Sequence, residues 1–197
     1  MKNVKTFMDF TCPFSYIGFS ILQRLKNEEG DVEYTWYPYE LNEDTPLEGK
    51  DKSGKFQNGG MDEAFKRITR LGDEYGLEYK NKNMAYNTGR AHRAALFARD
   101  SGKLDEFAGR VFKAIFEEGK NVAEKEVLND IGLEVGLNIV EMNRCIDDGG
   151  YEEEMEEAKK MASVYEVESV PTFIVDQERK VTDLKPYAEF KKDLQGK

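Results

Sequence analysis

The chain has 197 residues, of which 39% are hydrophobic, and its formal net charge is −10 at pH 7. This length and hydrophobic content predict a folded domain with its own core, while the acidity argues against nucleic acid and anionic membranes as partners. Since the N-terminus lacks an apolar secretory signal and no apolar run approaches the roughly 20 residues of a membrane span, we expect a cytoplasmic protein.

The first predicted elements are a strand over residues 4–10 and a helix over residues 16–26, with Cys12 at their junction. A helix N-terminus offers unpaired N–H groups and the positive end of the helix dipole. Both favour the thiolate, which is the reactive form, so we expect the pKa of the Cys12 thiol to be lowered. Pro13 suits the first helical turn, where its missing N–H costs nothing. This pattern predicts a nucleophile at a strand–helix corner, with a buried structural cysteine as the alternative.

Residues 31–41 are rich in aromatic and β-branched side chains, which predicts a second strand. Because the connection from the first strand contains a helix, we expect the two strands to be parallel. Residues 42–60 and 79–87 predict loops. From residue 61 to about residue 167 every periodic segment is typical of helix. Capping signals precede two of these helices: Thr88 before residues 89–100, and Asn138 with Glu141 before residues 140–147.

Strand character returns at the C-terminal end of the chain. Residues 170–176 and 180–184 predict an antiparallel hairpin, and a closing helix follows. These β segments can join the first two strands in one sheet only if the helical block is an insertion. The sequence therefore predicts an α/β fold whose core comprises residues 1–56 and 168–197, with an all-helical insertion over residues 57–167.

This order of elements, with Cys-Pro at the first corner and Val-Pro-Thr at the third strand, resembles the thioredoxin fold with a helical insertion. More specifically it resembles the DsbA superfamily in its cytosolic FrnE-like branch. The stretches that carry the resemblance span the chain and are residues 9–18, 36–42, 87–93 and 169–173. The resemblance implies a DsbA-like thioredoxin fold and a protein disulfide oxidoreductase or isomerase that works by thiol–disulfide exchange.

The resemblance also implies roles for individual residues. The candidate catalytic residues are Cys12 as the attacking thiolate, Ser15 as a hydrogen-bond donor to it, and Pro171, which the family places in cis opposite the cysteine. The peptide before a cis-proline can present its backbone groups to an extended substrate, and this assigns Val170 to the substrate groove. The remaining candidate substrate-binding residues are Pro13, Phe14, Thr172 and His92.

The chain departs from the dithiol pattern at Ser15, where an oxidoreductase of this family carries a second cysteine. Without that cysteine, Cys12 can form a mixed disulfide but has no neighbour to resolve it. One interpretation is a monothiol oxidoreductase whose mixed disulfide is resolved by an outside thiol. A second is a thiol-dependent isomerase or transferase. The 2-hydroxychromene-2-carboxylate isomerases and kappa-class glutathione transferases have a sequence similar to Ser-Pro-Tyr-Ser at this corner, and this chain shares the serine at its fourth position. A further alternative for the function is a non-catalytic binding module with the thioredoxin fold. A further explanation of Ser15 is that the serine was introduced by substitution.

Two residues outside the corner are also candidates. His92 is the only histidine, and in this family its helix borders the active site, where it would tune the thiolate or contact substrate; a structural histidine is the alternative. Cys145 is a weaker candidate for the resolving thiol, since a disulfide needs Cα atoms within about 7 Å. Two cysteines are too few for a disulfide framework, so a disulfide here would be transient.

The sequence shows no cluster of metal ligands, and we expect neither a metal nor a required cofactor. Glutathione or another low-molecular-weight thiol is the candidate for the outside thiol. The expected partners are disulfide- or thiol-bearing proteins or small molecules, with no nucleic acid and no membrane, and a homodimer is left open.

Overall fold

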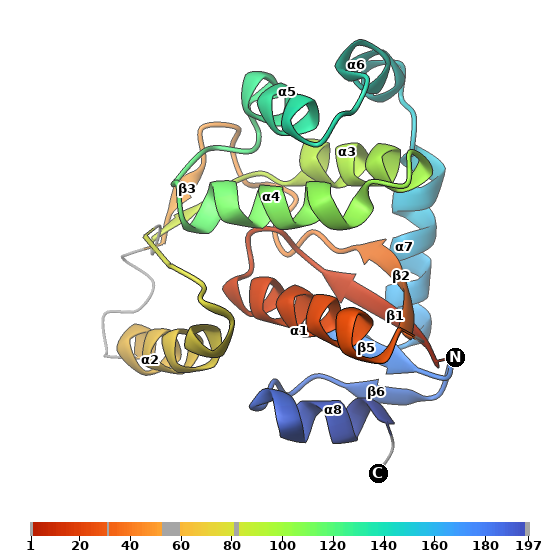
Figure 1. The fold of residues 1–197 in the computed structure, drawn as a ribbon. Coiled ribbons are helices and arrows are strands. Elements are labelled where there is room, and N and C mark those ends of the chain that lie inside the picture. Colours follow the sequence, from red (N-terminus) through yellow and green to blue (C-terminus); the bar gives the residue numbers. More distant parts are fainter. Residues whose placement is uncertain (1, 31, 53–59, 81–82, 196–197) are drawn as a thin grey trace.

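Figure 1 shows a computed structural model of the chain. The structure describes residues 2–30, 32–52, 60–80 and 83–195. The strands of the main sheet are β1 (Lys2–Met8), β2 (Val32–Pro38), β5 (Thr172–Val175) and β6 (Arg179–Val181), in the order β2-β1-β5-β6. β1 is parallel to β2 and antiparallel to β5, and β5 and β6 pair as an antiparallel hairpin. The predicted parallel pair and the predicted C-terminal hairpin are therefore confirmed.

Successive side chains of a strand point to opposite faces of the sheet, and both faces are covered by helices. On β1, Met8 joins the main hydrophobic cluster with α1 (Pro13–Glu29) and α8 (Tyr187–Gln195). Phe7 joins a second cluster on the other face, beneath α7 (Glu152–Val164). The sheet is thus the middle layer of the molecule (Figure 1).

The chain between β2 and α7 is largely helical. Its helices are α2 (Gly60–Gly72), the short 3-10 helix η2 (Asp73–Tyr75), α3 (Gly89–Asp100), α4 (Leu104–Phe116), α5 (Lys125–Glu134) and α6 (Ile139–Asp147). α4 packs against α1 and α3. The ring of Phe112 on α4 contacts those of Phe10, Tyr16 and Phe19 at centroid distances of 5.0, 5.3 and 5.6 Å. The helices and one face of the sheet therefore share a hydrophobic cluster.

The boundaries of the predicted insertion, residues 57–167, stay a prediction. The first boundary, between residues 56 and 57, lies outside the described residues. Two segments predicted as loops pair with each other instead, as β3 (Lys50–Asp51) and β4 (Met84–Ala85) in a small antiparallel sheet. Two-residue strands show no alternation of side chains, so the sequence carried no signal for them. The predicted cap of α6 is confirmed, because the Asn138 side chain accepts the N–H of Glu141 at 3.2 Å.

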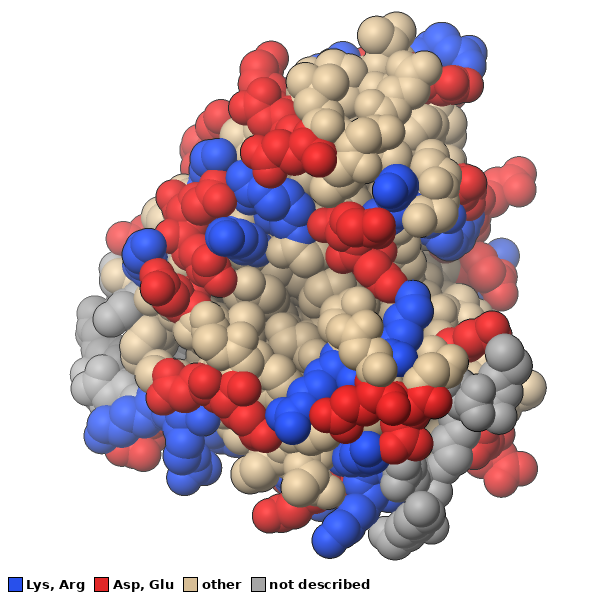
Figure 2. Space-filling model, viewed as in Figure 1, with Lys and Arg blue, Asp and Glu red and all other residues tan. Residues whose placement is uncertain are grey.

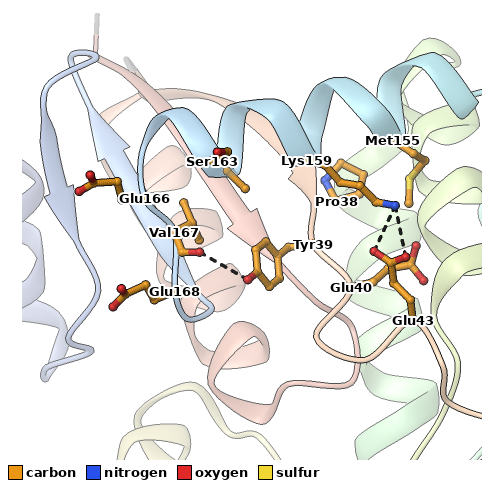
Figure 3. Close-up of a pocket in the computed structure, with 11 residues that line it drawn as sticks. Pro38, Tyr39, Glu40, Glu43, Met155, Lys159, Ser163, Glu166, Val167 and Glu168 are labelled. Atoms are coloured by element: carbon orange, nitrogen blue, oxygen red, sulfur yellow. Dashed lines mark hydrogen bonds and ion pairs between the residues drawn. The ribbon is translucent and has the colours of Figure 1, made fainter.

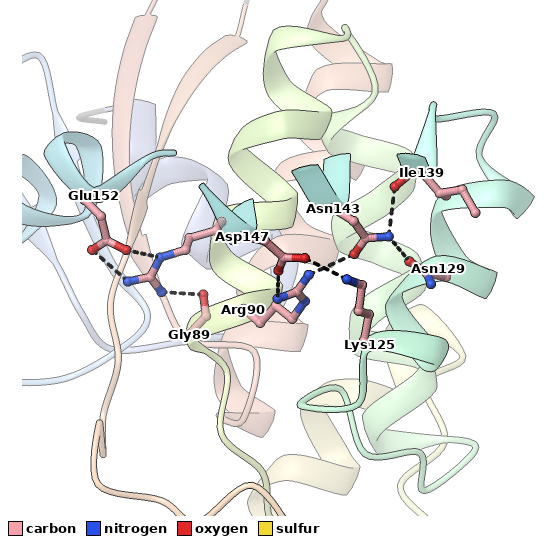
Figure 4. Close-up of polar contacts among 9 residues, drawn as sticks. Gly89, Arg90, Lys125, Asn129, Ile139, Asn143, Asp147 and Glu152 are labelled. Atoms are coloured by element: carbon pink, nitrogen blue, oxygen red, sulfur yellow. Dashed lines mark hydrogen bonds and ion pairs between the residues drawn. The ribbon is translucent and has the colours of Figure 1, made fainter. Parts of the chain in front are cut away.

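Polar contacts tie α3 to its neighbours (Figure 4). Arg90 on α3 donates to Asp147 at 2.7 Å, and Lys125 on α5 reaches the other oxygen of that carboxylate at 2.7 Å. Arg93, also on α3, donates to both oxygens of Glu152 on α7 at 2.8 and 3.0 Å. Ion pairs at the surface add little to stability, so these contacts orient α3 more than they stabilise the fold.

Acidic and basic side chains are interleaved over the face of the molecule in Figure 2, without a large area of one sign. Among the helices that the structure describes, none has the length and apolar character needed to cross a membrane.

Candidate functional site

The corner between β1 and α1 has the form predicted from the sequence. Cys12 is the N-cap residue of α1, with extended backbone angles of φ −94° and ψ 116°, and Pro13 occupies the first helical position. The N–H of Cys12 donates to the Asp9 carbonyl at 3.1 Å, and the Cys12 carbonyl accepts the N–H groups of Ser15 and Tyr16 at 3.0 and 3.3 Å. These bonds fix the position of the Cys12 side chain at the first turn of the helix.

The Cys12 thiol faces the segment that precedes β5. Its Sγ donates to the Val170 carbonyl at 3.3 Å, and the peptide bond between Val170 and Pro171 is cis. The side chain of Cys12 is buried among Phe7, Val170 and other apolar residues of the second cluster. The structure therefore brings together Cys12, Val170 and Pro171, as the resemblance implied, while their catalytic roles stay predictions.

The pKa of the Cys12 thiol differs from the sequence-based expectation. Burial raises this pKa, and the Asp9 carboxylate raises it further, while the N–H and hydroxyl of Ser15 and the N–H of Phe14 lower it. The predicted lowering is wrong for this structure, because the loss of hydration outweighs the donors at the helix N-terminus. In the free protein Cys12 is thus held as a protonated thiol that donates to Val170.

Ser15 lies directly behind the thiol and is fully buried. Its hydroxyl oxygen accepts the N–H of Asp9 at 3.3 Å, and its hydroxyl proton stabilises negative charge on Cys12, which lowers the pKa of the thiol. The serine thus supports the sulfur by a hydrogen bond, at the place where a dithiol enzyme has its second sulfur.

Phe14 and Thr172, two further residues predicted to bind substrate, differ in how they are buried. Phe14 is partly buried against the cluster that holds Cys12. Thr172 is fully buried, and its hydroxyl donates to the Ser169 carbonyl at 2.6 Å, which closes the turn around the cis peptide instead of facing solvent. α1 approaches that turn closely at Gly18, where a Cβ would lie 3.0 Å from the Pro171 ring.

His92 lies inside the molecule and not in the groove. Its side chain is 0% exposed, its ring stacks on Phe10 with the centroids 4.8 Å apart, and its Nε2 lies 3.4 Å from Oδ1 of Asp9. Contact with a substrate would need an exposed atom, which His92 lacks here. Thr88 was expected to cap α3, but its hydroxyl donates to the same Asp9 oxygen at 2.8 Å and makes no cap bond.

Asp9 was not singled out from the sequence, although its side chain contacts both Thr88 and His92. An acidic residue at the end of an apolar strand is a usable signal, because a carboxylate is costly to bury unless other groups bond to it.

A cavity of about 430 Å³ lies beside the corner, between α7 and the segment that follows β2 (Figure 3). Its residues are Pro38, Tyr39, Glu40, Glu43, Met155, Lys159, Ala162, Ser163, Glu166, Val167 and Glu168. Ala162 and Val167 also belong to the apolar cluster that contains Cys12, although Cys12 itself does not line the cavity. Lys159 is the basic residue of the lining and pairs with Glu43 at 3.1 Å. Burial raises the pKa of Glu40, against the influence of His92 and Arg93.

Cys145 belongs to another part of the molecule. It lies on α6, which packs against α3 and α5, and neither cysteine forms a disulfide. In the described part of the chain, no group of histidine, cysteine and acidic side chains is arranged to hold a metal ion.

Comparison with known proteins gives consistent results. The family model of the DSBA-like thioredoxin domain matches residues 3–195. A probable DsbA oxidoreductase from Streptomyces coelicolor has a similar structure, with a TM-score of 0.88 and 18% identity over 100% of this chain and 89% of that chain. Among curated proteins, the uncharacterized protein YwbO of Bacillus subtilis is 26% identical over 181 residues, which are 88% of this chain and 86% of that protein.

Two further structures share the fold. A 2-hydroxychromene-2-carboxylate isomerase has a TM-score of 0.73 and 17% identity over 91% of this chain and 88% of that chain. The cytosolic disulfide reductase DsbM from Pseudomonas aeruginosa, in its structure with GSH, has a TM-score of 0.70 and 15% identity over 98% of this chain and 99% of that chain.

Proposed function

The chain belongs to the DSBA-like thioredoxin domain family, and we propose that it is a monothiol, FrnE-like member that catalyses thiol–disulfide exchange through Cys12. The predicted DsbA-like thioredoxin fold and the predicted superfamily are confirmed, and members of this family are generally oxidoreductases or isomerases. The observation that carries the proposal is the 3.3 Å contact between the Cys12 thiol and the carbonyl of Val170, directly before cis-Pro171.

The first step begins with an extended substrate lying along the Val170 peptide. A backbone N–H of that substrate is a stronger donor to the Val170 carbonyl than a thiol is, so substrate binding releases the Cys12 thiol from this bond. The sulfur, supported by the Ser15 hydroxyl, attacks one sulfur of the substrate disulfide R–S–S–R′. The products are the mixed disulfide Cys12–S–S–R and the thiol R′–SH, which takes the proton that Cys12 loses.

The second step needs a thiol from outside the site, because Ser15 cannot attack a disulfide. A low-molecular-weight thiol R″–SH attacks the mixed disulfide, which gives R–S–S–R″ and returns Cys12 to its thiol form. Glutathione or a similar thiol is then a co-substrate, and no metal or bound cofactor takes part. The substrates are disulfide-bearing proteins or small molecules. The proposal places the protein in the cytoplasm, where such thiols are maintained in reduced form.

A second candidate function is a thiol-dependent isomerase or transferase, favoured by Ser15 and by the shared fold of the 2-hydroxychromene-2-carboxylate isomerase. In that case a bound thiol would be the nucleophile and Cys12 would only hold it. Cys12→Ser would then keep activity, because a hydroxyl can replace the thiol as a hydrogen-bond donor. In the exchange mechanism Cys12→Ser is inactive, since the reacting sulfur is gone.

The test is acid quenching followed by mass spectrometry. We expect the protein, incubated with a mixed-disulfide peptide alone, to accumulate one covalent adduct on Cys12 and then stop. Addition of a low-molecular-weight thiol should release the adduct and allow many turnovers. An adduct on Cys145, or many turnovers without an added thiol, would contradict the proposal.

A further inference from the structure

A buried carboxylate lies directly behind the reactive corner. Asp9 is 1% exposed, and its Oδ1 accepts the N–H of Thr11 at 3.2 Å and the hydroxyl of Thr88 at 2.8 Å. Nε2 of His92 lies 3.4 Å from the same oxygen, and Oδ2 accepts the N–H of Leu41 at 2.8 Å. This side chain therefore joins the corner to α3 and to the segment that follows β2.

The backbone of Asp9 contacts the corner at both ends of the Cys-Pro-Phe-Ser motif. Its carbonyl accepts the N–H of Cys12 at 3.1 Å, and its N–H donates to the Ser15 hydroxyl at 3.3 Å. A shift of Asp9 would therefore move both the reacting sulfur and the hydroxyl that supports it. Side-chain contacts from α3 hold Asp9 in place, so α3 fixes the geometry of the corner.

We propose that Asp9 is a positioning residue for Cys12 and that His92, together with Thr88, offsets its negative charge, so that α3 sets the reactivity of the corner. This inference rests on the proposed function in one respect, since it takes Cys12 as the reacting group.

The chemistry of the pair supports this assignment. A carboxylate accepts hydrogen bonds, so Nε2 of His92 can donate to Oδ1 of Asp9 across this 3.4 Å contact in the tautomer that carries its hydrogen on Nε2. The imidazole is enclosed by aromatic rings, and its Nδ1 is buried without a partner, so the Asp9 contact is the side-chain bond that orients the ring. A negative charge in this buried position opposes ionisation of the nearby thiol, and each donor to the carboxylate reduces that effect.

Other titratable and charged groups surround the pair. Glu40, after β2, adds negative charge, and Arg93 on α3 offsets it. On the other side of the corner, the hydroxyl of Tyr79 reaches the Pro13 carbonyl at 3.5 Å. Burial raises the pKa of Tyr79, and the neighbouring Tyr16 and Cys12 raise it further.

The experiment measures the rate of Cys12 alkylation by iodoacetamide against pH, with Cys145→Ala as the parent background. Asp9→Asn removes the negative charge but keeps an acceptor, and we expect the midpoint to fall by about one pH unit. His92→Phe removes the donor but keeps a ring that can stack on Phe10, and we expect the midpoint to rise by about half a pH unit. His92→Gln keeps a donor and should stay near the parent.

Asp105→Asn is the matched control. Asp105 is a half-buried carboxylate that accepts bonds from Lys26 and Tyr34 at the opposite end of β2 from the corner. We expect this variant to lose stability without moving the alkylation midpoint of Cys12. A midpoint that moves as far as in Asp9→Asn would overturn the proposal, because the effect would then not depend on the position of Asp9.

Opposite shifts in Asp9→Asn and His92→Phe support the proposal, since displacement of the corner alone would not give the two variants opposite signs. Shifts in the same direction, or no shift in either, overturn it. If Asp9→Asn does not fold, the two His92 variants still decide, and equal midpoints in them overturn the proposal. Alkylation does not require exchange activity, so failure of this test leaves the proposed function standing, and an inactive protein with the expected shifts refutes only the function.

Discussion

The two cysteines of this chain lie in regions built in different ways. Cys12 is 7% exposed, and the groups around its sulfur come from Asp9 after β1, from the first turn of α1 and from the segment before β5. Cys145 is more accessible, and Gly150, whose N–H donates to the Cys145 carbonyl at 2.8 Å, lies only five positions along the same chain segment. Cys12, the more buried of the two thiols, is therefore the one that groups from distant segments surround. Convergence of distant segments, and not exposure, is therefore what favours Cys12 over Cys145 as the proposed reacting group.

The largest difference between the two regions should appear in exchange activity. Cys12→Ala removes the sulfur that attacks the substrate, so we expect turnover of a disulfide peptide to fall to the uncatalysed background. Cys145→Ala should leave turnover unchanged. The measurement is steady-state exchange with a saturating outside thiol, after circular dichroism has shown both variants to be folded. If Cys145→Ala were the inactive variant, the assigned roles would be reversed.

Ser15→Cys should produce the next largest effect, by giving the corner a second thiol. The new thiol would lie on the same first turn as Cys12 and could resolve the mixed disulfide within the molecule. A group held this close reacts at an effective concentration above that of a dissolved thiol. We expect an internal disulfide and the loss of the trapped adduct, both visible by mass spectrometry after acid quenching.

Ser15→Ala is the control for that substitution, because it removes the hydroxyl without adding a thiol. We expect it to trap the adduct as the parent does, but more slowly, since the pKa of Cys12 rises when the Ser15 donor is lost. If Ser15→Cys forms no internal disulfide, the two positions are not held as the structure describes them, and the thiol-dependent isomerase becomes the better proposal.

The corner could be predicted because its information is local. A strand, a cysteine and a proline at a helix start are adjacent in sequence, and so are Asn138 and Glu141 at the cap of α6. The charge environment of the corner could not be predicted in this way. The helix terminus alone predicted a lowered pKa for Cys12, whereas burial by residues far along the chain raises it. Likewise, the bond from Thr88 to Asp9 joins positions 79 residues apart.

Each of the two regions also contains a closely packed glycine. A Cβ at Gly18 would lie 3.0 Å from both the Pro171 and Phe173 side chains, and one at Gly150 would lie 2.5 Å from Sγ of Cys145. Overpacking of this kind costs about 1–3 kcal/mol, so urea denaturation should show that both alanine variants are destabilised. Only Gly18→Ala should also slow exchange, because it displaces the turn that faces Cys12. Equal activities in the two variants would show that this turn tolerates movement.

Stability at high pH should depend on Cys12. Burial raises the pKa of this thiol, so the folded protein binds the proton more tightly than the unfolded chain, whose thiol has a pKa of about 8.5. The stabilisation is fully present below about pH 8.5 and is lost as pH rises through the pKa of the folded state. The loss should approach about 1.4 kcal/mol for each pH unit in that interval. Urea denaturation of the parent and of Cys12→Ala at pH 7 and pH 9.5 tests this, and an equal loss in both would contradict the burial effect.

The smallest expected effect concerns the charge of the substrate. The cavity between α7 and the segment that follows β2 is lined by Glu40, Glu43, Glu166 and Glu168 but by one basic side chain, Lys159, which already pairs with Glu43. A cationic disulfide such as cystamine should therefore exchange a few-fold faster than the anionic disulfide of glutathione. The preference should weaken as salt rises from 0.1 to 1 M, because the screening length falls from about 10 to about 3 Å.

Two variants with the same change in net charge test whether the cavity causes that preference. Glu168→Gln removes a carboxylate from the cavity, and Glu141→Gln removes one from α6, the helix that carries Cys145. If the preference arises at the cavity, Glu168→Gln should reduce it and Glu141→Gln should leave it intact. If both variants reduce it equally, the preference reflects the overall acidity of the protein and not the region around Cys12. A preference located at the cavity would also favour a neutral or cationic outside thiol over glutathione, because the resolving thiol must approach the same sulfur.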